Sequence, residues 1–533
     1  MKKNLLLALI AAITLCATVA AQRMESFTPQ QKLRLAEALI ETYYVEPVDA
    51  DTIVDEAIIA MLKTLDPHSA YSTPDETKEL NQPLEGKFSG IGIQFNMVED
   101  TVYVIQPTAG GPSEKVGIRP GDRIISANDT VIAGRKLNNS AIIKVLRGPK
   151  GSRVDLKVKR AGEPELLDFV LERADIPIYS VDAKYMVNDS TGFISVTRFA
   201  ESTAQEVRQA ADSLARCGMR NLILDLSSNG GGYLGSAVEL AEQFLRKGDP
   251  IVFTRGLNSP ENHFNAQRNG DMPVDRLVII VNQYSASAAE ILSGAIQEND
   301  RGLIVGRRTF GKGLVQRPFP FPDGSMIRLT TSRYYTPSGR CIQKPYEKGK
   351  GEEYQLDMLN RYNSGELWHP DSIHLDKSTE YRTLRNGRVV YGGGGIMPDV
   401  FVPADTSYYS PYYRDLVAKG VIVKYTLGLI DSHRAELLKS YPTETAFDSG
   451  YEPDQAILDG LVEAATAAGI EFNQQQWDTS RPIIAAMLKG LMLRDLYDNG
   501  TYVRATNPLS KDFIEAVGLI NDPERYHRLL RGR

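Results

Sequence analysis

Two short apolar runs, each followed by a loop, constrain the middle of this 533-residue chain more than any other feature. Residues 277–281 (LVIIV) are β-branched and have the length of a buried strand. After a turn, residues 287–296 place their apolar side chains on one helical face. Residues 303–305 (LIV) lead into a loop, TFGKG, at residues 309–313. The pattern predicts a strand, a turn, a helix, a second strand and a loop.

Ser287 stands at the predicted strand-to-helix turn. A hydroxyl there lies near backbone N–H groups and the positive end of a helix dipole, which suits a nucleophile whose attack creates an oxyanion. Lys312, between two glycines, could bring an amine to that serine. Two other interpretations stay open. Ser287 and Glu290 match a capping box, in which the serine only closes the helix, and a lone lysine is commonly a solvated surface charge.

This segment resembles the active-site region of the carboxy-terminal processing proteases, also called tail-specific proteases, of the S41 serine–lysine type. The blocks that agree in order and spacing are residues 284–290 (YSASAAE), Gly306 and residues 309–316 (TFGKGLVQ). The resemblance implies that Ser287 is the nucleophile and that Lys312, 25 residues further on, is the general base. It also implies that Gln316 supports the lysine. Glu298 stands where some relatives have aspartate, so it could assist at the site, but a salt bridge on the helix is the favoured interpretation.

Composition and charge exclude several classes of function. The formal net charge of −6 argues against a nucleic-acid-binding protein and offers no basic patch for a membrane surface. A content of 42% hydrophobic and 24% charged residues is ordinary for a globular protein, and the length allows several domains. The six histidines show no metal-ligand spacing such as HExxH. No metal and no cofactor are implied.

The first 21 residues have the features of a secretory signal peptide, with two lysines, an apolar run and small residues before Ala21. The apolar run is short for a membrane span. Without this segment only Cys217 and Cys341 remain, so no disulfide framework is implied, although the two could still pair. We expect export to a bacterial periplasm. A membrane-associated form, including a lipid on Cys16, is left open.

Residues 22–84 are predicted to form a helical region, because their apolar side chains follow a helical period. The second helix should end near Pro67, since proline stops a helix. His68 is a tempting catalytic histidine. Its place in a turn beside Asp66 favours a structural role, and the family shows the same LDPHS block without a catalytic one.

Residues 85–175 resemble a PDZ domain. A glycine loop enters an alternating strand, and the block GPSEKVGIRPGDRI follows at residues 111–124. In such a domain, free backbone N–H groups bind a chain-terminal carboxylate while the peptide adds to the sheet edge. The carboxylate loop would consist of Gly90, Ile91, Gly92 and Ile93. The alternative is that the two glycines only make a turn.

Residues 176–405 alternate predicted strands and helices, which favours a largely parallel sheet. A buried strand at residues 221–226 ends in SSNGGG at residues 227–232. The lysine and hydroxyl of a nucleotide-binding P-loop are missing, which argues against nucleotide binding by this glycine loop.

The corresponding family segment reads RxNPGG, and the resemblance implies an oxyanion hole made by the N–H groups of Gly231 and Ala288. Ser227 and Gly230 depart from the arginine and proline of the family. Gly232 is therefore an alternative to Gly231, one position further on.

Other blocks that match the family lie at residues 327–331, 333–340 and 392–399, so the resemblance extends from about residue 44 to residue 402. The implied fold is α/β and multidomain. It has a crotonase/ClpP-like serine protease core, an inserted PDZ domain, and helical N- and C-terminal regions. Residues 344–388 are polar and tyrosine-rich, and we expect them at the surface.

Residues 406–533 show no catalytic motif and have helical apolar spacing at residues 416–430, 455–468 and 482–497. Such helices commonly bury their apolar faces against the parent domain. A subunit contact, and hence a homo-oligomer through terminal helices, is left open.

The function expected from these features is that of a serine endopeptidase, a hydrolase, which cleaves exported proteins near their C-termini. The PDZ domain would bind proteins or peptides with apolar C-terminal tails. Lys312 must be neutral to accept a proton, so burial must lower its pKa from an ordinary ~10.4. A serine–histidine hydrolase using His263 is a weaker alternative. A non-catalytic PDZ scaffold or chaperone is another, and the presence of Ser287, Lys312 and Gln316 argues against it.

Overall fold

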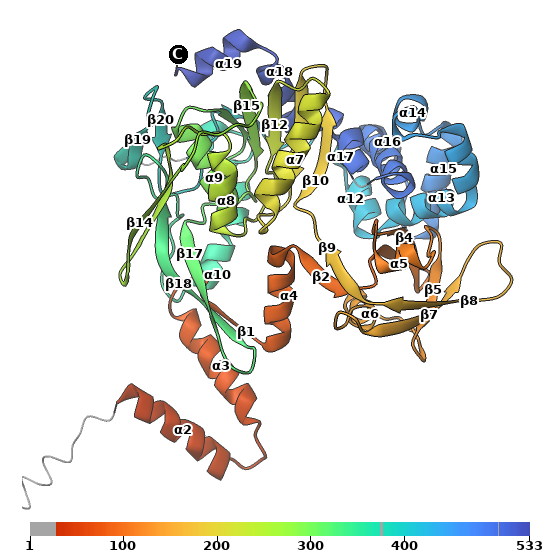
Figure 1. Cartoon of the computed structure of the whole chain (residues 1–533), viewed down its shortest axis with the longest axis horizontal. Helices are drawn as coiled ribbons and strands as arrows, with labels where there is room; N and C mark the ends of the chain where they lie inside the picture. The colour runs from red at the N-terminus through yellow and green to blue at the C-terminus, as the bar shows by residue number, and fades with distance from the viewer. Residues whose placement is uncertain (1–27, 374–376, 499, 533) are drawn as a thin grey trace, which may run out of the picture.

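The computed structural model of this chain describes residues 28–373, 377–498 and 500–532. The predicted signal peptide, residues 1–21, lies outside the described residues. Figure 1 shows helices projecting at the lower left, a central α/β body, a β-rich unit at the lower right and a helical unit above it. Within the described ranges, no helix is long and apolar enough to cross a membrane.

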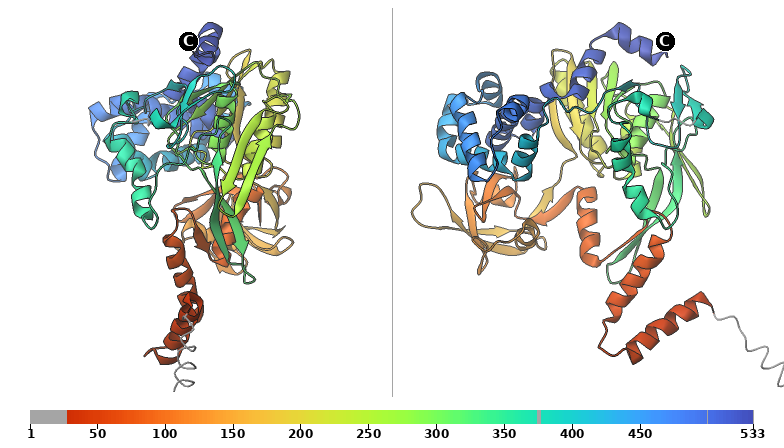
Figure 2. Two further views of the ribbon diagram at one scale, coloured as in Figure 1. Left: turned by 90° about the vertical axis from the view of Figure 1, so that its left-hand side faces the viewer. Right: turned by 180° about the vertical axis from the view of Figure 1, so that it is seen from behind.

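The N-terminal region consists of α2 (Pro29–Tyr43), α3 (Ala50–Lys63), β1 (Ala70–Ser72) and α4 (Pro74–Glu85). Both α2 and α4 begin with a threonine capping box and a proline in the first turn. The second helix ends before Pro67, as predicted. None of the residues of α2 is buried, and Figures 1 and 2 show α2 extending away from the body.

The predicted PDZ domain is an antiparallel sheet with two short helices. Its strands, in spatial order, are β3 (Ile93–Val98), β4 (Thr101–Pro107), β5 (Arg123–Ala127), β7 (Arg153–Lys159) and β8 (Leu167–Glu172), with β6 (Thr130–Val131) beside β5. The helices are α5 (Pro112–Lys115) and α6 (Asn139–Leu146), and the ribbon of β2 (Lys87–Gly90) and β9 (Ala174–Pro177) leads to the central body. Apolar side chains from β4, β7 and α6 form its core. β3 is an edge strand of this sheet.

The central body contains a six-stranded sheet of β10 (Val181–Met186), β11 (Thr191–Val196), β12 (Asn221–Asp225), β15 (Arg276–Val281), β16 (Leu303–Gly306) and β21 (Val400–Phe401). Only β10 runs antiparallel to its neighbour, so the predicted largely parallel sheet is confirmed. One face packs on α7 (Thr203–Arg216), α8 (Leu234–Glu242) and α9 (Ala288–Glu298). The other face packs on α18 (Lys511–Ile520) and α19 (Pro523–Leu530).

A second sheet of the central body comprises β1, β13 (Pro250–Gly256), β14 (Ser259–Asn265), β17 (Leu314–Pro320) and β18 (Met326–Tyr335). The tyrosine-rich segment that follows contains α10 (Gly351–Gln355), α11 (Asp357–Asn363), β19 (Glu380–Arg382) and β20 (Val389–Tyr391). It is not only a surface excursion, because Arg361 is buried and donates hydrogen bonds to the backbone oxygens of Arg308 and Thr309 at 2.6 and 3.0 Å. The segment therefore supports the loop that follows β16. Cys217 and Cys341 are both free thiols.

The helical unit contains α12 (Pro411–Ala418), α13 (Val421–Ser440), α14 (Glu444–Gly450), α15 (Gln455–Ala467), α16 (Gln474–Leu496) and α17 (Gly500–Thr506). Two details differ from the predicted helices. Gly420, with a left-handed φ of 65°, separates α12 from α13 where one helix was expected. The last predicted helix began at Pro482, but Asn473 caps α16 and Pro482 lies inside that helix.

This helical unit packs on the outer face of the PDZ-type sheet. Tyr103 and Ile105 of β4 form an apolar cluster with Leu427 of α13. Beside it, Arg123 and Asp431 form an ion pair of 2.7 Å. Figures 1 and 2 show the two units side by side in views from opposite directions.

Candidate active site

Ser287 occupies the N-cap position of α9, directly after the turn that follows β15. Its backbone has φ 56° and ψ −114°, a conformation that a serine adopts only where its surroundings impose it. The neighbouring Ser285 is fully buried, and its hydroxyl donates to the backbone oxygen of Leu226 at 2.7 Å and accepts from the N–H of Asn282 at 3.0 Å. Ser287 is only half-buried. Of the two serines, Ser287 is the one that is partly exposed.

The buried carboxylate of Glu290 joins the start of α9 to the loop that carries Lys312. Its Oε2 accepts hydrogen bonds from the backbone N–H groups of Ser287 at 2.8 Å and Lys312 at 2.9 Å. Its Oε1 accepts from the hydroxyl of Thr309 at 2.5 Å and the N–H of Gly311 at 2.7 Å. No more than two hydrogen-bond lengths therefore separate the backbone nitrogens of Ser287 and Lys312. Burial raises the pKa of Glu290, and these four bonds oppose that rise.

The predicted capping box is confirmed, since Ser287 and Glu290 form one at the start of α9. A capping glutamate ordinarily satisfies one backbone N–H group of its own helix. Here the same carboxylate also satisfies two N–H groups and a hydroxyl on another loop. The Glu290 carboxylate that caps α9 therefore also connects the start of this helix to residues 309–312.

Lys312 lies on the loop between β16 and β17, as predicted. Burial lowers the pKa of its amine, and the nearby Arg328 lowers it further, whereas Glu290 and Asp66 act in the opposite direction. Its Nζ makes no hydrogen bond or ion pair with any residue that the structure describes. A buried amine without a carboxylate partner is the kind of lysine that can be neutral near physiological pH.

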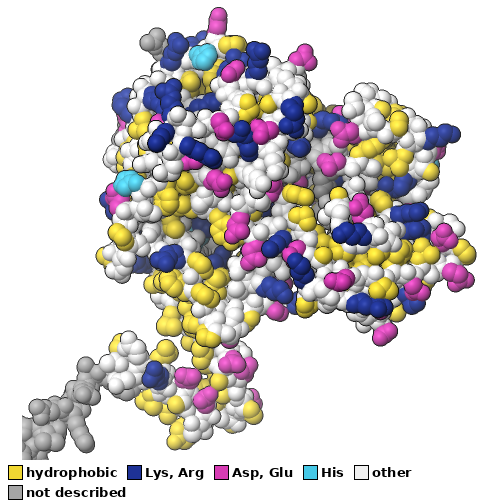
Figure 3. Space-filling view, viewed as in Figure 1, with side chains coloured by type: hydrophobic (Ala, Val, Ile, Leu, Met, Phe, Trp, Pro, Cys, Tyr) yellow, Lys and Arg dark blue, Asp and Glu magenta, His cyan; other side chains and the backbone are white. Residues whose placement is uncertain are grey.

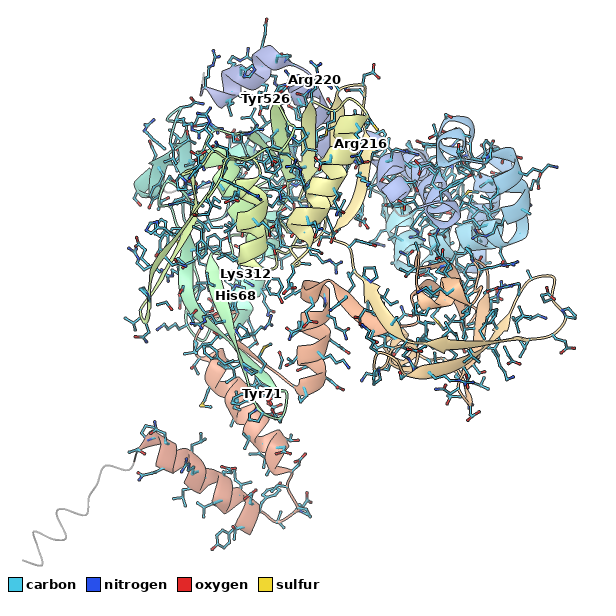
Figure 4. All side chains as sticks on the ribbon, viewed as in Figure 1. His68, Tyr71, Arg216, Arg220, Lys312 and Tyr526 are labelled. Atoms are coloured by element: carbon cyan, nitrogen blue, oxygen red, sulfur yellow. The ribbon has the colours of Figure 1, made fainter. Side chains whose placement is uncertain are left out.

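The turn between α3 and β1 lies beside Lys312, and Figure 4 shows His68 of this turn next to that lysine. Burial lowers the pKa of His68 to about 4, with the charge of Lys312 as the second cause. Nε2 of His68 lies 3.0 Å from the hydroxyl of Tyr354. Asp66 holds the turn, accepting hydrogen bonds from the backbone N–H groups of His68 and Ser69 at 2.9 and 3.0 Å.

Gln316 lies on β17, four residues beyond Lys312, and its side-chain amide is hydrogen-bonded to other residues. Nε2 of Gln316 donates to Oγ1 of Thr330 at 3.3 Å and to the backbone oxygen of Leu314 at 3.4 Å. The part of the chain that the structure describes shows no hydrogen bond between Gln316 and Lys312. Lys312 on the loop and Gln316 on the strand that follows it are therefore close in sequence but are not hydrogen-bonded to each other.

The glycine loop after β12 lies directly against Ser287. Gly231 has φ 98°, and a Cβ built on it would lie 2.8 Å from Cβ of Ser287 and 2.9 Å from the nitrogen of Ala288. Gly232 instead approaches Phe199, since its own added Cβ would lie 2.1 Å from that residue's oxygen. Of the two candidates for the oxyanion hole, Gly231 is the one that contacts Ser287.

The two N–H groups of the predicted oxyanion hole differ in this structure. That of Ala288 has no hydrogen-bond acceptor among the described residues. That of Gly231 donates to Oδ1 of Asn229 at 2.9 Å. One donor is therefore open and the other is occupied by its own loop.

Asp225 lies at the base of this loop and was not singled out from the sequence. Burial raises the pKa of its carboxyl to about 6, and the backbone N–H of Ser227 donates to it at 2.8 Å. Ser227 stands where the family has arginine, so this carboxyl lacks a neighbouring guanidinium from its own loop. Sequence reasoning named Asp66 only as a turn residue, without its effect on Lys312, and it missed Arg328. The charges of these two residues shift the pKa of Lys312 through space, and no local sequence pattern indicates that they lie near it.

The predicted carboxylate loop of the PDZ-type unit joins β2 to the edge strand β3. Gly92 has φ 73°, the left-handed region that favours glycine. The backbone N–H groups of Ile91 and Gly92 donate to no acceptor within the described residues. This loop therefore presents two N–H groups beside an open sheet edge.

Two other candidates lie apart from Ser287. Glu298 forms a fully buried ion pair with Arg340, which fits the predicted salt bridge. His263 lies on β14, where Nε2 is 2.7 Å from Oε1 of Glu261 and the ring stacks on Phe253. Within the described ranges, no hydrogen bond links His263 to Ser287.

Comparison with known proteins identifies three families along the chain. Residues 190–349 match peptidase family S41, residues 89–171 match a PDZ domain, and residues 412–498 match a family of unknown function (DUF8443). The S41 match includes Ser287, Lys312 and the glycine loop.

Among characterised relatives, the carboxy-terminal processing protease CtpB of Bacillus subtilis (strain 168) is 34% identical over 372 residues, which cover 69% of this chain and 75% of that protein. CtpA of the same organism is 33% identical over 344 residues, covering 63% and 73%. A solved photosystem II D1 C-terminal processing protease is 29% identical, covering 60% of this chain and 86% of that one, with a TM-score of 0.35. The assignment rests on the sequence matches.

The matches define the class as serine protease, a hydrolase of mixed α/β fold. Within that class, the chain belongs to the carboxy-terminal processing proteases of peptidase family S41, and it carries a PDZ domain.

Proposed function

We propose that this protease cleaves exported proteins near their C-termini, with Ser287 as nucleophile and Lys312 as general base. The observation that carries the proposal is the Glu290 carboxylate, whose Oε2 receives the backbone N–H groups of both residues at 2.8 and 2.9 Å. The half-buried hydroxyl of Ser287 and the lowered pKa of Lys312 support it.

In the proposed reaction, Oγ of Ser287 bonds to the carbonyl carbon of the scissile peptide and transfers its proton to Nζ of Lys312. The C–N bond then breaks, and the leaving amine takes the proton from Lys312. Water attacks the acyl-enzyme, Lys312 accepts its proton, and the ester bond breaks to restore the Ser287 hydroxyl and release the new C-terminus.

The N–H group of Ala288, with that of Gly231, would stabilise the oxyanion. Because Gly231 donates to Asn229 in this structure, the loop would have to release that bond when substrate binds. Gln316 would support Lys312 after a similar change of partner, from Thr330 to the amine.

For the PDZ domain we propose the binding of an apolar C-terminal tail. The backbone N–H groups of Ile91 and Gly92 would receive the terminal carboxylate, with Gly90 and Ile93 flanking them, and the tail would pair with β3. A substrate with a free C-terminus should have a KM at least severalfold lower than the same substrate with an amidated C-terminus.

The main competing function is a PDZ scaffold or chaperone that binds tails without cutting them. An unfolded protein with an apolar tail separates the two when its products are weighed by mass spectrometry. Cleavage near the C-terminus by the wild type, and none by Ser287→Ala or Lys312→Ala, is the expected result. Equal cleavage by all three would remove the proposed pair, and no cleavage by the wild type would favour the scaffold.

We propose the domain arrangement predicted from the sequence, with a signal peptide at residues 1–21 and export to a bacterial periplasm, either free or associated with a membrane. The N-terminal sequence of the mature protein, recovered from the producing cell, tests this directly. A mature chain that still begins at Met1 would contradict it.

A homo-oligomer through terminal helices is also proposed. α2 buries no residue, yet it exposes Leu33, Leu35 and Leu39, and a single 15-residue helix is marginal on its own. Figure 3 shows hydrophobic side chains gathered on these projecting helices. Light scattering should give a mass above that of one chain, falling to one chain in Leu35→Asp/Leu39→Asp. A single-chain mass for the wild type would contradict it.

A further inference from the structure

Tyr334, on β18, is bonded to both segments of the candidate active site. It is fully buried, with 1% of its surface exposed. Its hydroxyl donates to the backbone oxygen of Ser287 at 3.2 Å. Its backbone N–H donates to the oxygen of Gly313, the residue after Lys312, at 2.9 Å. Tyr334 thus links the turn that carries Ser287 to the loop that carries Lys312.

The peptide unit that Tyr334 contacts has two functional ends. The carbonyl of Ser287 and the N–H of Ala288 belong to the same planar, trans peptide, so they point in opposite directions. A donor that fixes the carbonyl therefore also fixes the direction of the Ala288 N–H, the open donor of the proposed oxyanion hole.

The carbonyl of Ser287 also accepts the N–H groups of Glu290 and Ile291, both at 2.9 Å, from the first turn of α9. Those bonds run along the helix and fix the carbonyl to α9 alone. Tyr334 is the side chain that fixes it to a different element. A residue in the strained conformation of Ser287 persists only when several contacts hold it.

We infer that Tyr334 is a positioning residue, which orients the Ser287–Ala288 peptide relative to Lys312. It does not touch the reacting atoms. The inference rests on the proposed roles of Ser287 and Lys312. Burial raises the pKa of Tyr334 far above its usual value, so its hydroxyl remains a hydrogen-bond donor throughout the working range of the enzyme.

The neighbouring Tyr335 provides a matched control. It lies on the same strand but faces the other way, where its ring stacks on Phe253 with centroids 4.8 Å apart. Arg255 lies over the same ring at 5.0 Å. Removing the hydroxyl of Tyr335 deletes the same atom from the same strand without touching the Ser287 peptide.

The test compares Tyr334→Phe with Tyr335→Phe on a tailed substrate, with kcat expressed per active site titrated by a covalent serine reagent. For Tyr334→Phe we expect kcat to fall about tenfold, which corresponds to about 1.4 kcal/mol of transition-state stabilisation, with KM unchanged. Tyr335→Phe should stay within twofold. The fold should survive, because the Ser287 carbonyl keeps its two helical donors.

A kcat for Tyr334→Phe within twofold of the wild type overturns the inference, and so does a rise in KM at constant kcat. Incorporation of 3-fluorotyrosine at position 334 keeps both the ring and the hydroxyl, so kcat should recover. A kcat as low as that of Tyr334→Phe would show that the hydroxyl does not restore activity, and it would overturn the inference. Activity in Ser287→Ala would instead remove the proposed function, so the two failures are distinguishable.

Discussion

At the scale of single residues, Glu290 decides how the site is held together. It is fully buried and accepts four hydrogen bonds, from three backbone N–H groups and one hydroxyl. A carboxylate can accept all four, because both of its oxygens are acceptors only. No apolar or basic side chain could fill this place.

Glu290→Gln should therefore be far more harmful than its size suggests. The amide would direct an NH₂ group at backbone donors, leaving N–H groups without an acceptor at about 1–3 kcal/mol each. We expect kcat to fall by roughly 10²-fold, since Ser287 and Lys312 lose their common acceptor. The melting temperature should fall as well. The exposed Glu239 of α8 gives a control, because Glu239→Gln should alter neither quantity, and a normal kcat in Glu290→Gln would contradict the role of the carboxylate.

Lys312 should cost the folded protein stability. Burial lowers the pKa of Lys312 in the folded protein. Below the ordinary lysine pKa of ~10.4 the amine is protonated more readily in the unfolded chain than in the folded protein, and this difference lowers the stability of the folded protein. Lys312→Met should abolish activity, by ~10³-fold or more, and raise the melting temperature at neutral pH. The gain should shrink as the pH rises toward 10. Calorimetry of Lys312→Met beside the exposed Lys184→Met checks this, and a lower melting temperature for Lys312→Met would contradict it.

Sequence patterns predicted Ser287 and Lys312 but not what holds them. Ser287 and Lys312 stand in short blocks with fixed spacing, which a single sequence displays. Glu290 was visible only as the end of a capping box, because its other partners lie some twenty residues away. Tyr334 lies in one of the blocks that match the family, residues 333–340, but that block does not indicate its role, since its bond to Ser287 depends on how β18 packs on α9.

At the scale of elements, the turn between α3 and β1 and the strand β18 bring opposite charges to Lys312. Asp66, in that turn, raises the pKa of Lys312, whereas Arg328 of β18 lowers it. The N-terminal region and the second sheet therefore act on the same amine with opposite signs.

Substituting these two residues should move the pH profile in opposite directions. Activity requires neutral Lys312, so kcat/KM should rise as pH increases through its pKa. Asp66→Asn removes the charge that favours the protonated amine, and the rise should move to lower pH. Arg328→Gln removes a charge that disfavours it, and the rise should move to higher pH. Profiles that move together, or do not move, would contradict the assignment of Lys312 as the group that titrates.

Elements with a strong period were predictable, and those set by tertiary contacts were not. β15 and α9 follow the predicted pattern, because their apolar side chains are buried in one core. The start of α16 was missed, since Pro482 suggested a first turn but Asn473 begins the helix further upstream. The segment after β18 appeared polar, yet Arg361 is buried there and donates a hydrogen bond to the backbone oxygen of Arg308, on the loop that leads to Lys312.

At the scale of the whole molecule, the helical unit positions the PDZ domain. Tyr103, Leu427 and the Arg123–Asp431 pair join the two units on the outer face of the sheet, which leaves the edge strand β3 open. Gln106 adds a hydrogen bond to the backbone oxygen of Tyr497 at 3.1 Å. Residues 412–498, which match a family of unknown function, therefore contain the side chains and backbone that contact the PDZ domain.

Reversing one charge of the pair should loosen the PDZ domain. Arg123→Asp and Asp431→Arg each place like charges together, and β4 should exchange its amide hydrogens faster. The double variant should recover most of the protection. Both side chains are partly exposed, so the coupling should be small, about 0.2–1 kcal/mol. Arg153→Asp, on β7, is the control, and unchanged exchange in both single variants would contradict a positioning role for this contact.

The central claim is that a hydroxyl at the start of α9 is activated by the amine of the following loop. The most direct measurement is the intact mass of the enzyme over time with a covalent serine reagent. We expect one adduct on Ser287 in the wild type, slower labelling by ~10²-fold or more in Lys312→Ala, and none in Ser287→Ala. Equally fast labelling of Lys312→Ala, or an adduct on another residue, would contradict it.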